Sequence, residues 1–151
     1  MPTAAAVPSA RHFVQERMAE LGYRRFADDA ALVASELVTN AVEETERHEN
    51  IKLYDGKVPL EQILAEGTFA GWWRPWLVCV SVYAHRRQGA VIEVWDCSRI
   101  PPKPERETDS LKMTGRGLAI VEAVAKVWGY RFPRCGGKVV FALLQNNTRE
   151  V

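Results

Sequence analysis

The sequence predicts a single α/β domain, and three observations carry this prediction. The chain has 151 residues, of which 47% are hydrophobic, and this is the size of one ordinary domain with its own core. Apolar residues recur at helical spacing between Ala30 and Ala41. Two runs rich in β-branched and aromatic residues, Trp76–Ala84 and Ala90–Trp95, flank a polar turn, which is typical of a β-hairpin.

The N-terminal part of the chain is expected to form a helix. Pro8 and Ser9 can begin it, and the apolar spacing continues to about Leu21. Gly22 follows directly, and glycine is the residue that most often ends a helix. A short connector then leads to the second helix, which the sequence predicts to end near Glu46.

The second helix carries polar side chains that its own stability does not explain. Glu36 and Asn40 lie four residues apart, so their side chains point the same way. Asn40 and the β-branched Thr39 are modest helix formers, so a role outside the helix is expected. The adjacent face is an apolar stripe that should pack on the core, formed by Ala30, Val33, Ala34, Leu37, Val38 and Ala41.

Residues 47–75 depart from the main pattern and are interpreted as an inserted segment. A two-turn helix is predicted from Pro59 to Glu66, with Gly67 as its cap. Three tryptophans follow within residues 72–76, either as a partner-docking surface or, more in keeping with large aromatics, as packing against the sheet.

An acidic residue and a long loop follow the second strand. Asp96 and Ser98 stand where the chain must leave the sheet; taken alone, Asp96 could simply begin a turn. Residues 99–114 are rich in proline and charge, which predicts a mobile loop.

The loop ends in Gly115-Arg116-Gly117, at the start of a helix predicted to run from Leu118 to Val127. Glycines at a helix N-terminus expose backbone N–H groups to an anion, so this is a candidate phosphate site. The dinucleotide fingerprint and the usual P-loop are both absent from the sequence. A second hairpin, 128–132 with 138–144, ends the domain.

Composition excludes several classes of protein. With 20 basic and 19 acidic residues the net charge is +1, so no overall field favours nucleic acid or a membrane surface. Three widely spaced cysteines form neither a disulfide framework nor a zinc motif. No run is long enough to span a membrane and no export signal begins the chain, so a cytoplasmic protein is expected.

Read together, these motifs resemble the GHKL ATPase superfamily. Their order is Glu-x-x-x-Asn on a helix, Asp-x-Ser after a strand, a loop closing in Gly-x-Gly, and Gly-Gly before a last strand. The stretches beginning at Glu36 and Gly115 look like the bacterial anti-sigma factor serine kinases. The resemblance implies the Bergerat-type ATP-binding fold, a two-layer sandwich whose mixed, mostly antiparallel sheet has helices on one face. It also implies that residues 99–114 are a lid over ATP.

The resemblance assigns roles to individual residues. Asn40 would bind Mg²⁺ through its carbonyl oxygen, and Glu36 would be the catalytic base. Asp96 would accept a hydrogen bond from the adenine amino group. The remaining nucleotide-binding positions lie beside Asp96, in the lid and at the glycine turn: Ser98, Lys112, Thr114, Gly115, Arg116, Gly117 and Leu118.

Two hypotheses remain open at this point. In the first, the protein is an ATP-dependent serine/threonine kinase that phosphorylates a serine of an anti-sigma-factor antagonist and binds a sigma factor. In the second, it is a non-catalytic nucleotide-binding interaction module of the same fold. Retention of both Glu36 and Asn40 favours the kinase, whereas Glu43 and Glu44, next to the expected phosphates, favour the module. No nucleic-acid or membrane partner is expected, and a homodimer is left open.

Overall fold

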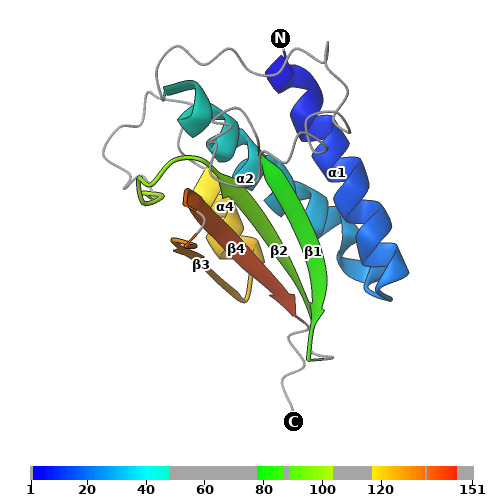
Figure 1. The fold of residues 1–151 in the computed structure, drawn as a ribbon. Helices are drawn as coiled ribbons and strands as arrows, with labels where there is room; N and C mark the ends of the chain where they lie inside the picture. The colour runs from blue at the N-terminus through cyan, green and yellow to red at the C-terminus, as the bar shows by residue number, and fades with distance from the viewer. Residues whose placement is uncertain (1, 48–77, 87–88, 104–116, 135, 146–151) are drawn as a thin grey trace.

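The computed structural model describes residues 2–47, 78–86, 89–103, 117–134 and 136–145, and these form a two-layer α+β fold (Figure 1). The helices α1, α2 and α4 lie on one face of a four-stranded sheet. Every strand pair in these residues is antiparallel. The predicted sandwich, with helices on one face of a mostly antiparallel sheet, is therefore confirmed.

Helix α1 spans Pro2–Glu20. The prediction that it begins at Pro8 is wrong, because Pro8 lies inside the helix and the alanine-rich stretch before it is strongly helix-forming. The core face is made by Ala10, Val14 and Met18, one turn apart.

The end of α1 matches its prediction. Gly22 has a φ of +83°, a conformation that favours glycine. The N–H of Tyr23 donates to the carbonyl of Met18 at 2.7 Å and that of Gly22 to Ala19 at 3.1 Å, the two bonds of a Schellman motif. The chain then passes through the 3₁₀ turn Arg24–Phe26.

Helix α2, Ala27–Arg47, is the central element of the helical layer. Asp28 and Asp29 occupy its first turn, where carboxylates complement the helix dipole. Every residue of the predicted apolar stripe is at most 2% exposed: Ala30, Val33, Ala34, Leu37, Val38 and Ala41. The stripe packs against α1, α4 and β2, so the direction of the polar side chains on α2 is fixed by the core.

The sheet contains β1 (Cys79–His85), β2 (Gly89–Asp96), β3 (Val127–Arg131) and β4 (Lys138–Gln145). Their order is β1-β2-β4-β3, so the last strand lies between β2 and β3. Both predicted hairpins are present, β1 with β2 and β3 with β4. In the β2–β4 pair, Asp96 lies opposite Lys138.

Helix α4 spans Gly117–Val124, and Leu118 and Val121 are buried. The prediction that it continues to Val127 is wrong. Val127 begins β3 and lies opposite Leu143, whose carbonyl also accepts the N–H of Lys126 at 2.8 Å. Sheet pairing therefore overrides the helical spacing of the apolar residues.

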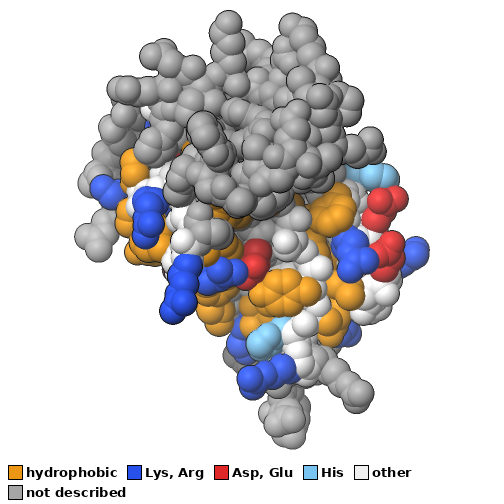
Figure 2. Space-filling view, in the orientation of Figure 1, with side chains coloured by type: hydrophobic (Ala, Val, Ile, Leu, Met, Phe, Trp, Pro, Cys, Tyr) orange, Lys and Arg blue, Asp and Glu red, His pale blue; other side chains and the backbone are white. Residues whose placement is uncertain are grey.

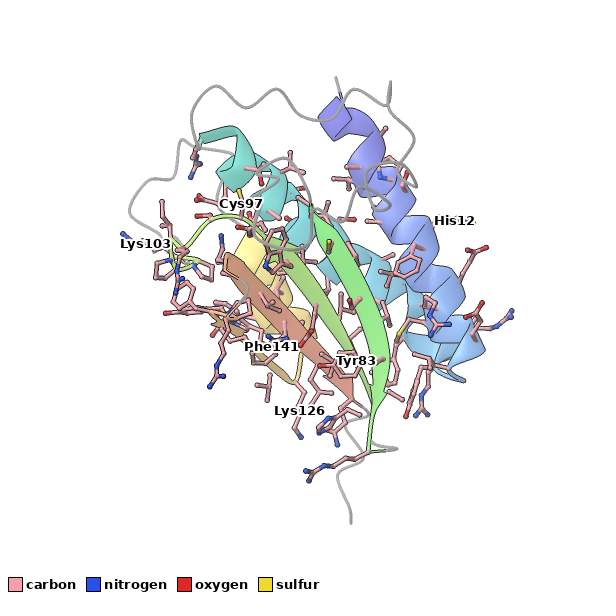
Figure 3. The ribbon with its side chains drawn as sticks, viewed as in Figure 1. His12, Tyr83, Cys97, Lys103, Lys126 and Phe141 are labelled. Carbon is pink, nitrogen blue, oxygen red and sulfur yellow. The ribbon has the colours of Figure 1, made fainter. Side chains whose placement is uncertain are left out.

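The other face of the sheet has apolar and charged groups side by side. Figure 2 shows hydrophobic side chains among basic and acidic ones on this face, and Figure 3 places Tyr83 and Phe141 there. The hydroxyl of Tyr83 donates to Glu93 at 2.9 Å, and Arg131 donates to the same carboxylate.

Some predictions lie outside the described residues. They concern the short helix and the tryptophans of the inserted segment, and the lid beyond Lys103. Among the helices that the structure describes, none is long and apolar enough to cross a membrane.

Candidate functional site

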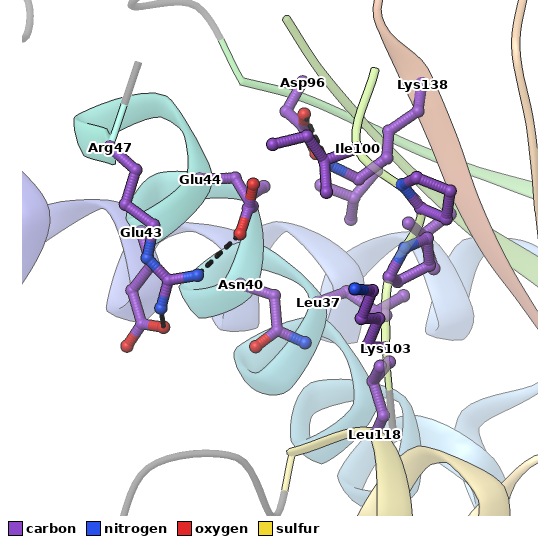
Figure 4. Close-up of a pocket in the computed structure, with 15 residues that line it drawn as sticks. Leu37, Asn40, Glu43, Glu44, Arg47, Asp96, Ile100, Lys103, Leu118 and Lys138 are labelled. Carbon is purple, nitrogen blue, oxygen red and sulfur yellow. Dashed lines mark hydrogen bonds and ion pairs between the residues drawn. The ribbon is translucent and has the colours of Figure 1, made fainter. Parts of the chain in front are cut away.

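A pocket of about 410 Å³ lies between α2, α4 and the adjoining ends of β2 and β4 (Figure 4). This is within the usual volume of small-ligand sites. Its apolar walls come from α2, α4, both strands and the segment after β2: Leu37, Ala41, Val94, Ile100, Pro101, Pro102, Leu118 and Val140. A flat, apolar ring system can be packed between such walls.

Asp96 lies at the end of β2 and lines this pocket, although it is only 1% exposed. Its Oδ1 accepts the backbone N–H of Ser98 at 2.8 Å, so the carboxylate also begins the turn that leaves the sheet. The turn interpretation and the functional interpretation of Asp96 are therefore compatible.

Ser98 is fully buried and is not among the residues that line the pocket. Its Oγ donates to Glu44 at 3.3 Å and accepts the N–H of Ile100 at 3.1 Å. These contacts tie the segment after β2 to α2, so Ser98 positions the wall rather than facing the pocket.

Lys138 is one of the site residues that the sequence did not reveal as functional. It begins β4, is 2% exposed, and places Nζ 2.8 Å from Oδ1 of Asp96. Burial raises the pKa of the Asp96 carboxyl above its usual value, with Glu44 acting in the same direction and Lys138 and Ser98 against it. Asp96 and Lys138 thus form a buried charge pair in the pocket wall.

Glu36, Asn40 and Gly117 meet where α2 passes the N-terminus of α4. A β-carbon at Gly117 would lie 2.7 Å from Oε2 of Glu36 and 3.6 Å from Oδ1 of Asn40. Both side chains are half-buried, and Asn40 lines the pocket whereas Glu36 lies at its margin. Because Gly117 has no side chain, the carboxylate of Glu36 can lie against the start of α4, next to the amide oxygen of Asn40. A helix N-terminus can bind a phosphate, and carboxylate and amide oxygens can bind a divalent cation.

Glu43 and Glu44 are paired with Arg47 on the same helix. The Nη1 atom of Arg47 lies 2.8 Å from Oε1 of Glu44, and Nη2 lies 3.9 Å from Oε2 of Glu43. All three residues line the pocket, and Figure 4 shows the guanidinium between the two carboxylates. The negative charge expected here from the sequence is therefore partly compensated.

The structure brings together most of the predicted site that it describes. Asn40, Asp96 and Leu118 line one pocket, and Glu36 and Gly117 adjoin it. The other four predicted nucleotide-binding positions lie outside the described residues: Lys112, Thr114, Gly115 and Arg116.

Sequence reasoning missed the contributions of Lys138, Arg47 and Lys103 to the pocket. Lys138 directly follows the Gly136-Gly137 turn, and this was its only signal in the sequence. Lys103 lies in the described start of the predicted lid, and Figure 3 shows it near the end of β2.

The chain matches the sequence model of a known protein family. The sequence model of the family described as histidine kinase-like ATPase domain matches residues 1–142, which is most of the chain. No curated protein matches the chain.

Proposed function

The chain belongs to the histidine kinase-like ATPase domain family, within the GHKL superfamily, and from this membership we propose that it is an ATP-dependent protein serine/threonine kinase. Membership makes it an ATP-binding, histidine kinase-like ATPase domain. The proposal adds a protein serine as phosphate acceptor, Mg²⁺ as the metal, and catalysis by residues of α2.

The observation that carries the proposal is the meeting of Glu36, Asn40 and Gly117. A domain that only bound nucleotide would need no carboxylate beside the phosphate position. Here the carboxylate of Glu36 lies against the first residue of α4, and a β-carbon at Gly117 would displace it. This arrangement supports a base held next to the γ-phosphate.

The reaction would be an in-line transfer. Glu36 takes the proton of the serine hydroxyl as the serine oxygen forms its bond to the γ-phosphorus. The bond between that phosphorus and the β–γ bridging oxygen breaks, and ADP leaves with the electron pair. Asn40 would supply an oxygen ligand to Mg²⁺, which would neutralise charge on the phosphates, and the N–H groups at the start of α4 would hold the phosphates in place.

Asp96 would bind the adenine ring of the nucleotide. It lines the apolar part of the pocket, where its carboxylate can accept a hydrogen bond from the adenine amino group. The predicted lid, residues 99–114, would close over the nucleotide. The N–H groups around Gly115, Arg116 and Gly117 would hold the phosphates, and Arg116 or Lys112 would add positive charge.

The proposed partners follow the anti-sigma factor kinases that the sequence resembles. The phosphate acceptor would be an anti-sigma-factor antagonist, and the second partner a sigma factor. A non-catalytic interaction module is the second candidate, and two observations favour it. Asp96 already has a cation as partner, and two glutamates line the pocket.

Thermal unfolding tests the nucleotide site. Saturating Mg-ATP is expected to raise the melting temperature of the protein through mass action, and Asp96→Ala should remove this rise. The matched control is Asp28→Ala, a carboxylate in the first turn of α2 away from the pocket, which should keep the rise. No rise with ATP or ADP would overturn the proposal.

Phosphate transfer tests the catalytic claim. With radiolabelled ATP and a candidate antagonist, Glu36→Gln should lose transfer and keep nucleotide binding. Binding with no transfer by the wild-type protein to any serine-containing antagonist would favour the interaction module.

A further inference from the structure

We propose that Lys138 reads the nucleobase together with Asp96, by donating a hydrogen bond to a purine ring nitrogen adjacent to the amino group. This inference rests on the proposed nucleotide site. It assigns to Lys138 a role in base selection that the motifs of the sequence do not indicate.

The two side chains offer an acceptor and a donor next to each other. Oδ1 of Asp96 and Nζ of Lys138 are 2.8 Å apart, and the backbone pairing of β2 with β4 fixes both residues in register. Adenine presents the complementary arrangement, because its amino group is a donor flanked by two ring nitrogens that are acceptors. One base edge can therefore satisfy both side chains.

Both charged side chains are almost fully buried, and both residues belong to the wall of the pocket. The side chains of Asp96 and Lys138 are 2% and 3% exposed, yet both residues line the cavity. Figure 4 shows them together in the wall of the pocket, with Asn40 further along it on α2. The adenine ring of a nucleotide packed between the apolar walls would thus contact the Asp96–Lys138 pair with its edge. The phosphates of the nucleotide would then lie toward Asn40 and Gly117.

A lysine is a costly choice if its only role is to neutralise Asp96. Both charges must be taken out of water, and an uncharged pair in a buried position is often as stable. A fixed ammonium that also donates to the base would discriminate between purines, since a buried donor without an acceptor is penalised. The test must therefore separate a contact with the base from a purely structural ion pair.

Nucleotide analogues make this separation. We would measure the affinities of the wild-type protein for ATP, 1-deaza-ATP and 7-deaza-ATP by calorimetry; each analogue replaces one ring nitrogen by C–H. One of the two analogues is expected to bind about tenfold or more weakly than ATP, the effect of losing a hydrogen bond from a charged donor. Equal affinity for all three overturns the inference but leaves the nucleotide site intact, whereas no binding of ATP itself overturns the proposed function.

Variants then assign the donor. In Lys138→Met, ATP and the weaker analogue should bind with nearly equal affinity, because the group that distinguished them is gone. The double variant Asp96→Asn/Lys138→Met leaves no unpaired buried charge and serves if the single variant does not fold. A preference for ATP that persists in a folded variant assigns the contact to another group and overturns the inference.

Discussion

A β-carbon on Gly117 would lie 2.7 Å from Oε2 of Glu36, so any side chain at the first residue of α4 would need the space that the proposed base on α2 occupies. The contact is with the end of a flexible side chain, which can move away. Substitution at this position should therefore displace the carboxylate without disrupting the core.

Gly117→Ala is expected to abolish phosphate transfer while leaving the melting temperature almost unchanged. Alanine is a better helix former than glycine by up to about 1 kcal/mol, which offsets the crowding. The measurement pairs a transfer assay with thermal unfolding. A variant with normal transfer would show that Glu36 need not occupy its observed position.

Gly22→Ala is the matched control for this substitution. Nothing lies within 4 Å of the added β-carbon, but the φ of +83° strains any other residue. This variant should lose about 1 kcal/mol of stability and retain phosphate transfer. Gly117→Ala should therefore lose phosphate transfer and keep its stability, whereas Gly22→Ala should lose stability and keep phosphate transfer.

The Asp96–Lys138 pair predicts a pH-dependent loss of stability. Lys138→Met leaves a buried carboxylate without its cation, and breaking such a pair costs about 3–5 kcal/mol near neutral pH. Burial raises the folded-state pKa of Asp96 above its unfolded value, and the variant lacks the ammonium that opposes this rise. The folded variant therefore binds a proton at Asp96 more tightly than the folded wild-type protein does. As the pH falls through the pKa of Asp96 in the folded variant, the difference in unfolding free energy between variant and wild type becomes smaller.

Urea unfolding at several pH values measures this deficit. Asp96→Asn is the matched control, because it leaves a buried ammonium that protonation cannot relieve. The loss of unfolding free energy in Asp96→Asn should therefore not become smaller in the same way when the pH is lowered. A pH-independent deficit in Lys138→Met would contradict the explanation.

The sequence predicted the parts of the site that depend on local periodicity. Glu36 and Asn40 were found because helical spacing places them beside an apolar stripe, and every residue of that stripe is buried. The turn at Asp96 was found because it follows a strong strand pattern. These features are determined by neighbouring residues, so the chain itself reveals them.

The pairing of β2 with β4 could not be predicted in the same way. These strands are separated in the chain by α4 and β3, and their register depends on packing across the whole sheet. Asp96 and Lys138 are 42 residues apart, so no local pattern connects them. The same long-range pairing explains why Val127 joins the sheet instead of extending α4.

Arg47 is expected to influence nucleotide affinity more than stability. Its side chain is 69% exposed, so loss of its ion pairs should change the free energy of unfolding by no more than about 0.5 kcal/mol. Arg47→Gln uncovers the charges of Glu43 and Glu44 in the pocket and should weaken Mg-ATP binding several-fold. Calorimetry at low and high salt checks this, because screening should reduce the difference.

Arg17→Gln provides the control for this charge removal. Arg17 forms an ion pair with Glu20 at the end of α1, outside the pocket. Its removal changes the net charge of the protein by the same amount and should leave ATP affinity unchanged. Equal weakening by both variants would indicate a general charge effect instead of a local one.

Tyr83, on the open face of the sheet, is expected to ionise at higher pH than an ordinary tyrosine. Burial raises the pKa of its hydroxyl, as do the hydrogen bond to Glu93 and the charge of that carboxylate, whereas Arg131 lowers it. Because the folded pKa is above the unfolded one, the stability that this group contributes is present below about pH 10 and is lost as the pH rises through the folded pKa. Ultraviolet titration of tyrosinate, with Tyr83→Phe subtracted, isolates this group. Glu93→Gln should lower the pKa of Tyr83, and an unchanged titration curve in that variant would show that the carboxylate does not control it.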